Sequence, residues 1–352
     1  MFPLQRLLFP SLILSLFSGC AAQPVDIYEP RSIPMINSPA GAGSAEPNLS
    51  IDSDGRVLLS WIERADEDQN RLQFSVLEPG SVVWSGPKTV AEGVNWFVNW
   101  ADFPSLIPLP AGRLAAHWLE KTGPDTYAYG VNVALSDNGG QSWSEAITPH
   151  SDGTETEHGF VSMLPIEDGS VSVVWVDGRQ MATPSGGDMS LMQAFIRPDG
   201  SVQAETLLDD RICECCQTSA ATIPGGQLLV YRDRSVDEIR DIAILTYRDG
   251  GWSHPRTLSR DGWEIYGCPV NGPSISAADE VVAVSWFTSA DDEPAVWLVI
   301  SNDAGETFGS PVRIDDGQPL GRVEVMALPT SAFVAWMEQT DNGAEIRLKQ
   351  VK

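Results

Sequence analysis

The sequence predicts an all-β fold, a six-bladed β-propeller of four-stranded antiparallel blades. Three observations support this prediction. A strand-like run that ends in an aromatic residue recurs six times, a second aromatic marker keeps the same period, and a turn signal precedes every run. A repeat of 50–57 residues is typical of propeller blades, each of which is one small sheet.

The first marker is a short run of apolar and β-branched residues, such as VLLSW or VSVVW, placed directly after a turn signal such as SDGR or EDGS. Such bounded runs are typical of buried strands. The six runs end at Trp61, Trp118, Trp175, Tyr231, Trp286 and Trp336. Successive runs are therefore 57, 57, 56, 55 and 50 residues apart.

The second marker joins an aromatic residue to a small residue, a spacer and Pro or Ala, and it occurs at Trp84, Trp143, Trp252 and Phe308. Both markers together define six units, over residues 43–93, 94–151, 152–208, 209–260, 261–317 and 318–352. The last unit is short by about one strand. Residues 24–38 would supply that strand and close the ring.

Two of the turn markers belong to longer octapeptides, Ser136–Trp143 and Ser301–Phe308, which both fit S-x-[DN]-x-G-x-[ST]-[WF]. In such a turn the Asn or Asp side chain would cap the backbone, Gly would take a positive φ and the aromatic would tuck beneath. The octapeptide resembles the Asp-box, or BNR repeat, of the sialidase superfamily. The resemblance covers nearly all of residues 43–352 and implies a sialidase-like propeller in which these turns are structural.

The N-terminus has the pattern of a bacterial signal peptide, because residues 1–19 combine Arg6 with a short apolar run. The end of that run resembles a lipobox, Phe17-Ser-Gly-Cys20, which implies cleavage before Cys20 and lipid on that residue. Residues 20–42 would then be a lipidated tether and ring-closing strand. The resemblance implies a cell-envelope location, lipid-anchored at the outer membrane on its periplasmic or surface face. A plain secretory signal is the alternative interpretation.

A formal net charge of −26 argues against a nucleic-acid partner, because an anionic surface repels phosphate. The same charge disfavours adsorption to anionic lipid, so any membrane contact would be made by the N-terminal lipid alone. We expect a monomer whose ligand is a small molecule, a glycan or a metal ion.

The expected ligand site is one mouth of the central channel, lined by the loops that lead into the first strand of each blade. These lead-in loops are Gly43–Pro47, Asn95–Asp102, Thr154–Gly159, Arg211–Ser219, Trp263–Pro273 and Pro319–Val325. Possible sugar-stacking platforms are Trp96, Trp100, Trp263 and Tyr266, unless these rings pack between blades or plug the channel. Possible carboxylate-binding groups are Arg179, Arg234, Arg240 and Arg322, unless neighbouring acids pair with them.

Four cysteines, Cys213, Cys215, Cys216 and Cys268, fall in the lead-in loops of blades 4 and 5. In an oxidising compartment they could form two disulfides, with a Cys213–Cys268 bridge and a strained Cys215–Cys216 ring. Alternatively, with His158 of the next blade, they could hold a thiophilic metal such as Cu(I) or Zn. Redox-active thiols are the third possibility.

The catalytic set of active sialidases is not matched. Those enzymes carry Arg-Ile-Pro leading into the first blade and a late Tyr nucleophile, whereas this chain has Glu46-Pro47 at that point and no tyrosine after Tyr266. A carboxylate pair for another glycosidase could still exist. The candidates are Asp177, Glu238 and Glu264, within a wider set that adds Asp102, Glu155, Glu157 and Asp188.

Three functional hypotheses follow. The first is a lipoprotein whose propeller binds a ligand, such as a thiophilic metal ion, at a Cys/Trp/Arg-rich channel mouth. The second is a carbohydrate-active enzyme, an exo-α-sialidase-like or other glycoside hydrolase. The third is a structural or interaction module in which disulfides staple the loops. Fold alone does not decide among them.

Overall fold

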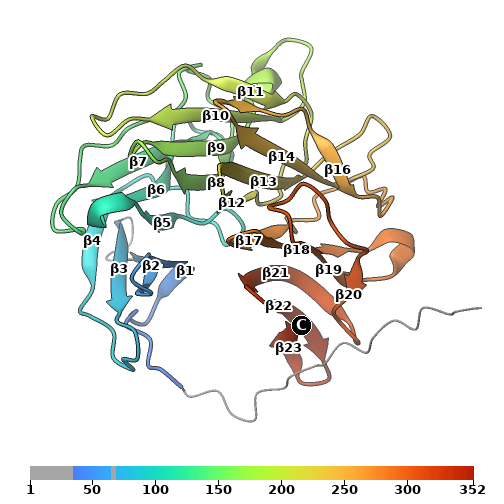
Figure 1. Ribbon diagram of the computed structural model, residues 1–352. Coiled ribbons are helices and arrows are strands. Elements are labelled where there is room, and N and C mark those ends of the chain that lie inside the picture. Colours follow the sequence, from blue (N-terminus) through green and yellow to red (C-terminus); the bar gives the residue numbers. More distant parts are fainter. Residues whose placement is uncertain (1–34, 65–68) are drawn as a thin grey trace, which may run out of the picture.

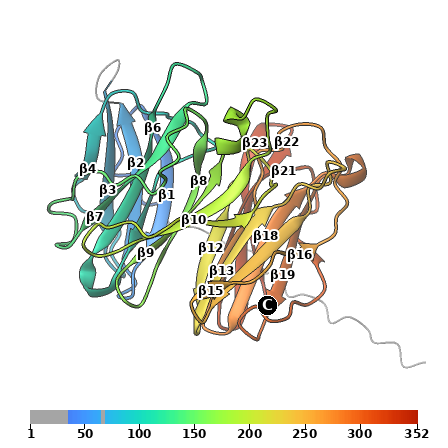
Figure 2. The same cartoon turned by 90° about the horizontal axis from the view of Figure 1, so that it is seen from above.

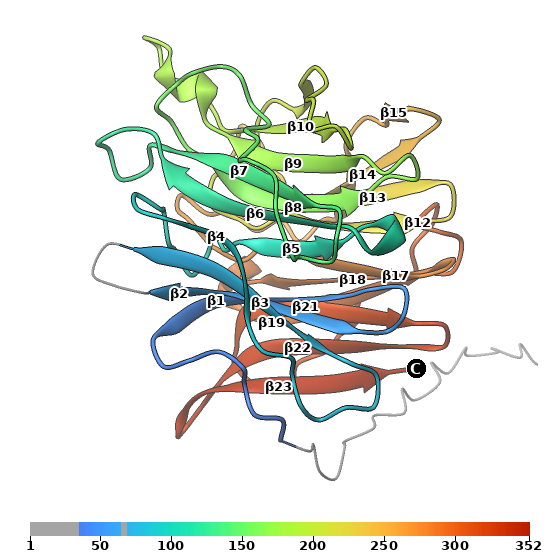
Figure 3. The ribbon, with the colours of Figure 1, turned by 90° about the vertical axis from the view of Figure 1, so that its left-hand side faces the viewer.

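The computed structural model of the protein describes residues 35–64 and 69–352. Within them, six antiparallel sheets follow one another around a ring in sequence order (Figure 1), which confirms the six-bladed β-propeller. Seen from above, blades 1 to 3 and blades 4 to 6 form the two halves of the ring (Figure 2). Neighbouring sheets are stacked face to face (Figure 3), with the hydrophobic core between them.

The strands of each blade run from the centre outward in chain order. Blade 1 has β1 (Ser44–Ile51), β2 (Val57–Arg64), β3 (Asn70–Leu77) and β4 (Lys88–Gly93). Blade 2 has β5 (Ser105–Pro108), β6 (Leu114–Lys121) and β7 (Tyr129–Ser136), with an outer bridge at Ile147. Blade 3 has β8 (His158–Pro165), β9 (Val171–Asp177), β10 (Ser190–Ile196) and β11 (Thr206–Asp209).

The second half repeats this order. Blade 4 has β12 (Ser219–Ile223), β13 (Gly226–Arg232), β14 (Ile242–Arg248) and an outer strand in two pieces, β15 (Gly251–Trp252) and β16 (Arg256–Ser259). Blade 5 has β17 (Ser274–Ala278), β18 (Val281–Thr288), β19 (Ala295–Ser301) and β20 (Val312–Arg313). Blade 6 has β21 (Pro319–Leu328), β22 (Ser331–Thr340) and β23 (Gly343–Val351).

The predicted ring-closing strand, residues 24–38, falls almost entirely outside the described residues, as do the signal peptide and Cys20; residues 35–38 are not strand. The described helices are three single turns, η1 (Pro110–Gly112), η2 (Arg179–Ala182) and η3 (Ala290–Asp292). No helix in the described part of the chain is long and apolar enough to cross a membrane.

The recurring aromatic residue lies on the second strand of every blade and fills the space between sheets. Trp61, Trp175 and Trp286 are at most 1% exposed. A buried indole needs a partner for its N–H, and that of Trp286 donates to Asp261 Oδ2 at 2.7 Å. The sequence period therefore marks one buried aromatic anchor per blade.

The two octapeptide turns have the predicted hairpin geometry. A side-chain oxygen of Asn138 or Asp303 accepts the backbone N–H of the residue four positions later, at 2.9 Å in both turns. Gly140 has φ +76°, and a Cβ there would lie 2.4 Å from the ring of Phe74 in blade 1. Glycine is therefore required both by the turn and by the packing of the neighbouring blade.

Three inner strands begin with a β-bulge. The registers of β1, β8 and β21 shift near their starts, and the residues Glu46, Phe160 and Arg322 at these points have positive φ values of 54°, 50° and 56°. The segments Gly43–Pro47 and Pro319–Val325, predicted as loops, are therefore mostly bulged strand. Bulges re-aim side chains, and these three lie at the same end of their blades.

Candidate functional site

The lead-in segments of blades 2, 4, 5 and 6 meet at one mouth of the ring. Gln217 Nε2 donates to Ala101 O at 2.6 Å, and Gln217 Oε1 accepts the N–H of Gly272 at 3.1 Å. Asn271 Oδ1 accepts the N–H of Arg322 at 2.9 Å. Because the bond between Gln217 and Ala101 joins blades 4 and 2, which are not adjacent, the loop that contains Ala101 crosses the mouth and partly covers the channel.

Two of the four predicted stacking platforms are packed inside the protein. Trp96 is buried and stacks on Trp118 with ring centroids 5.7 Å apart, and Trp263 is buried against Phe287. These two rings have no free face because they pack the interior, so the structure does not support the platform prediction for them.

The other two aromatic candidates reach solvent. Trp100 is 52% exposed, but the Arg322 guanidinium covers one face of its ring at 3.5 Å from the centroid. Tyr266 is 81% exposed. Arg322 stacks on Trp100 rather than pairing with Glu324, and within the described residues no carboxylate lies within ion-pair distance of it.

Arg179 is bound to acids of its own blade and does not face the mouth freely. Its Nε donates to Asp177 Oδ1 at 2.7 Å, and its Nη2 also pairs with Glu205. Asp177 is fully buried and accepts the indole N–H of Trp175 at 2.7 Å. A carboxylate without access to solvent cannot meet a substrate, so Asp177 is a structural residue and not a catalytic one.

His158 lies beside this ion pair and not with the cysteines. Its imidazole stacks on His150 at a centroid distance of 4.0 Å, and its Nε2 is 3.1 Å from Asp152 Oδ1. The donor atoms of these three residues lie within 4.8 Å of one another, as metal ligands would. However, His150 Nε2 already accepts the N–H of Val131 at 3.2 Å, and the Arg179 guanidinium is 3.5 Å from Asp152. The cluster is therefore satisfied without a metal.

Arg234 and Arg240 are held in a network of acids at the mouth. Arg234 pairs with Glu214 at 2.8 Å and Glu238 at 2.7 Å, and Arg240 pairs with the same two acids. The hydrogen bonds from Arg234 are the largest reason why the pKa of Glu238 falls to about 2. The network therefore presents ionised carboxylates to the mouth. Glu264, the third carboxylate candidate, is exposed and lies near Tyr266 outside this network.

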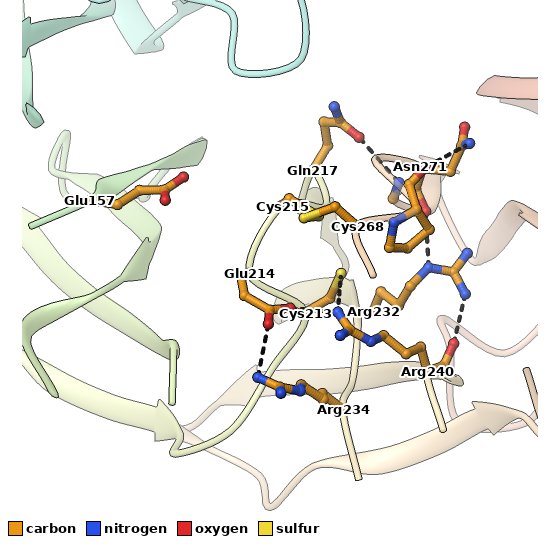
Figure 4. Close-up of a disulfide and its surroundings, with 12 residues drawn as sticks. Glu157, Cys213, Glu214, Cys215, Gln217, Arg232, Arg234, Arg240, Cys268 and Asn271 are labelled. Carbon is orange, nitrogen blue, oxygen red and sulfur yellow. Dashed lines mark hydrogen bonds and ion pairs between the residues drawn. A yellow bond between two sulfur atoms is a disulfide. The ribbon is translucent and has the colours of Figure 1, made fainter. Parts of the chain in front are cut away.

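The cysteines form one disulfide, between Cys215 and Cys268, and it ties the lead-in loops of blades 4 and 5 (Figure 4). The predicted Cys213–Cys268 bridge and the Cys215–Cys216 ring are therefore wrong. Cys213 and Cys216 are free and buried. Cys213 is fixed alongside the end of β13, because its N–H donates to Arg232 O at 3.0 Å. That pairing turns its sulfur inward.

The pKa values of the two thiols are shifted in opposite directions. Burial alone would raise the pKa of Cys213, but a hydrogen bond from Cys216, the backbone, and the nearby Arg232 and Arg240 together lower it. Burial and the neighbouring Cys213 raise the pKa of Cys216. This pair therefore carries a thiolate more readily than an isolated buried thiol would.

A second acidic group faces the mouth from blade 3. The Tyr129 hydroxyl lies 2.8 Å from both Asp102 Oδ2 and Glu157 Oε1. One phenol proton cannot serve two carboxylates, so both hydrogen bonds exist only if one carboxyl is also protonated. Asp102 accepts the N–H of Phe160 at 2.7 Å as well, which stabilises its ionised form. The extra proton therefore belongs on Glu157.

Burial raises the pKa of both Asp102 and Glu157 to about 7, so this pair holds a proton near neutral pH and the hydrogen bonds decide which carboxyl carries it. For Glu157, burial is the largest cause of the raised pKa, the hydrogen bond from Tyr129 opposes it, and the charges of Asp102 and Glu214 add to it. In Figure 4 Glu157 reaches from blade 3 toward the loop that carries Glu214 and Cys215. A neutral carboxylic acid and ionised carboxylates therefore share one mouth.

Glu157→Gln should change how stability depends on pH. The pKa of Glu157 is raised from 4.5 to about 7, so its contribution to stability is complete below pH 4.5 and is lost as the pH rises through 7. Glutamine mimics the protonated form at every pH. Between pH 5 and 8 the variant should gain up to about 3 kcal/mol relative to the wild type. Urea unfolding at both pH values measures this, and parallel pH profiles would contradict it.

Sequence reasoning included Glu157 only in a wide set of acids and missed Tyr129, Glu214 and Arg232. Glu214 stands inside the Cys-x-Cys-Cys run, and Arg232 directly follows the aromatic anchor Tyr231. Tyr129 starts β7, where a tyrosine in a strand looks like an ordinary core residue. Its role depends on two carboxyls from other segments, which no local pattern shows.

Comparisons with known proteins establish the fold. No protein-family model and no curated protein sequence matches the chain. An α-L-arabinofuranosidase from Fusarium graminearum is 13% identical, with a TM-score of 0.56 over 88% of this chain and 93% of that one. An α-L-arabinanase from Penicillium chrysogenum is 13% identical, with a TM-score of 0.53 over 88% and 92%. An ulvan lyase is 12% identical, with a TM-score of 0.50 over 86% and 78%.

Proposed function

We propose that this protein is a carbohydrate-active enzyme that cleaves a glycosidic bond at the channel mouth. The observation that supports this most is the pairing of a protonated acid, Glu157, with carboxylates that arginines keep ionised. Two carboxyl groups whose environments push their pKa values apart are what glycoside cleavage requires. The fold is also that of an α-L-arabinofuranosidase, an α-L-arabinanase and an ulvan lyase.

In this proposal Glu157 donates a proton to the leaving-group oxygen, which is the step that an acid with a pKa of about 7 performs well. Glu214, which pairs with both Arg234 and Arg240, is the carboxylate that stabilises positive charge on the sugar ring or activates the incoming group. Tyr129 and Asp102 are positioning residues that hold the second proton on Glu157.

Arg322 and Tyr266 supply the binding surface. Arg322 has no carboxylate partner among the described residues, so its guanidinium is available to a substrate acid group, as in sialic or uronic acids. Tyr266 offers an exposed ring for a sugar face. A sialidase of the usual kind is not proposed, because the late tyrosine nucleophile and the first-blade arginine are missing.

The test is turnover by the purified full chain. The panel contains fluorogenic arabinofuranosides, galactosides, glucuronides and sialosides, together with arabinan and ulvan. We expect hydrolysis of at least one substrate, with a rate that falls as the pH rises through about 7, because Glu157 then loses its proton. An unsaturated product would indicate a lyase instead. A folded protein that turns over nothing in the panel would contradict the proposal.

A further inference from the structure

A buried arginine without a carboxylate partner lies beside the two free thiols. Arg232 is 1% exposed, and its guanidinium donates to three backbone carbonyls, Asn271 O at 2.9 Å, Arg240 O at 2.6 Å and Phe287 O at 2.6 Å. Within the described residues no carboxylate is within ion-pair distance of it. A buried charge is expensive unless an opposite charge compensates it.

The carboxyls near Arg232 do not provide that charge. Arg240 is already paired with both Glu214 and Glu238. Asp241 interacts with Arg232 only at longer range, and its own oxygen accepts the N–H of Gly262 at 2.9 Å. The guanidinium also lies over the Trp263 ring, 4.9 Å from its centroid, but that ring carries no net charge. The neighbours that can become anionic are the thiols of Cys213 and Cys216.

The sulfurs form a compact, buried donor set. The Sγ atoms of Cys213, Cys215 and Cys216 lie within 4.8 Å of one another, but Cys215 is consumed by its disulfide to Cys268. Two free thiols remain, three positions apart, at 1% and 2% exposure. Arg240 Nη1 donates to Cys213 Sγ at 3.3 Å, which orients one sulfur.

We propose that Cys213 and Cys216 bind one Cu(I) ion as a two-coordinate bis-thiolate. Soft thiolates select Cu(I), whereas structural Zn²⁺ needs four ligands and only two sulfurs are free here. On binding, each thiol that is still protonated releases its proton, and two thiolates with one Cu⁺ carry a net charge of −1. That charge matches Arg232. The site is separate from the proposed acid at Glu157, so it does not depend on the glycan function.

Anaerobic titration of the full chain with Cu(I) held by a chromophoric chelator tests this. We expect one Cu(I) per chain with the disulfide intact, and X-ray absorption that shows two sulfur neighbours. Cys213→Ser and Cys216→Ser should each weaken binding at least about 100-fold. The double variant Cys215→Ser/Cys268→Ser is the matched control. It removes two nearby sulfur atoms but leaves both proposed ligands, so it should bind Cu(I) as tightly as the wild type.

Several results would overturn the proposal. One is a wild-type protein whose denatured, chelator-treated form has no free thiols, because Cys213 and Cys216 would then be a second disulfide. Others are free thiols that take up no Cu(I), retention of Cu(I) by either single serine variant, and loss of Cu(I) from the control variant. The wild-type X-ray absorption result keeps the test decisive if a serine variant fails to fold.

Discussion

Glu157→Gln should lower kcat on the substrate found in the glycoside panel by about 10²- to 10⁴-fold, the usual contribution of general acid catalysis. Glutamine keeps the size of the side chain and its contact with the Tyr129 hydroxyl but has no acidic proton to deliver. KM should change little, because the amide leaves the mouth intact. The pH profile should also lose its fall near pH 7, since the group with a pKa of about 7 is gone.

Comparing substrates with different leaving groups tests whether Glu157 is the general acid. A dinitrophenyl glycoside departs without protonation, so the variant should approach the wild-type rate on it while remaining slow on an unactivated glycoside. Glu155→Gln is the matched control, because Glu155 is an exposed acid two positions away and should keep full activity. Equal losses on both leaving groups would show that Glu157 acts through binding or folding and not by donating a proton.

The fold was predictable because each blade places an aromatic anchor on its second strand and packs mainly against its neighbours. Trp61, Trp175 and Trp286 occupy equivalent buried positions, so packing that is repeated in space appears as a period in sequence. The octapeptide turns were predictable for a similar reason, since their capping bonds span only four residues. Interactions between residues that are close in the sequence can be recognised from short sequence motifs.

The sequence allowed us to predict which segments form the channel mouth, but not which side chains act there. The lead-in segments do meet there, as the hydrogen bond from Gln217 to Ala101 O shows. Which side chains face the mouth, however, depends on small backbone rotations. Among three cysteines in four residues, Cys213 pairs its backbone with the end of β13 and Cys215 is the one that meets Cys268. Likewise the proton on Glu157 depends on Tyr129 from another blade.

Arg232→Met should destabilise the fold by about 3 kcal/mol or more, because three buried carbonyls lose their donor. Methionine fills similar space but cannot donate to the three carbonyls, which belong to β18 of blade 5, its lead-in loop and the neighbouring loop of blade 4. Each carbonyl left without a donor costs about 1–3 kcal/mol. Urea unfolding at constant pH, with chelator present so that no metal contributes, measures the difference.

The opposing term is the desolvation of the guanidinium, which the substitution relieves and which can exceed the hydrogen-bond loss for some buried ions. Arg248→Met is the matched control in the same blade. Its guanidinium pairs with Glu306 at 2.6 Å in a part-exposed position, so its loss should cost at most about 1 kcal/mol. A neutral or stabilising Arg232→Met would mean that the carbonyls find other donors and that Arg232 is kept for its charge. That charge would then act on the other groups beside it, the Trp263 ring and the thiols of Cys213 and Cys216.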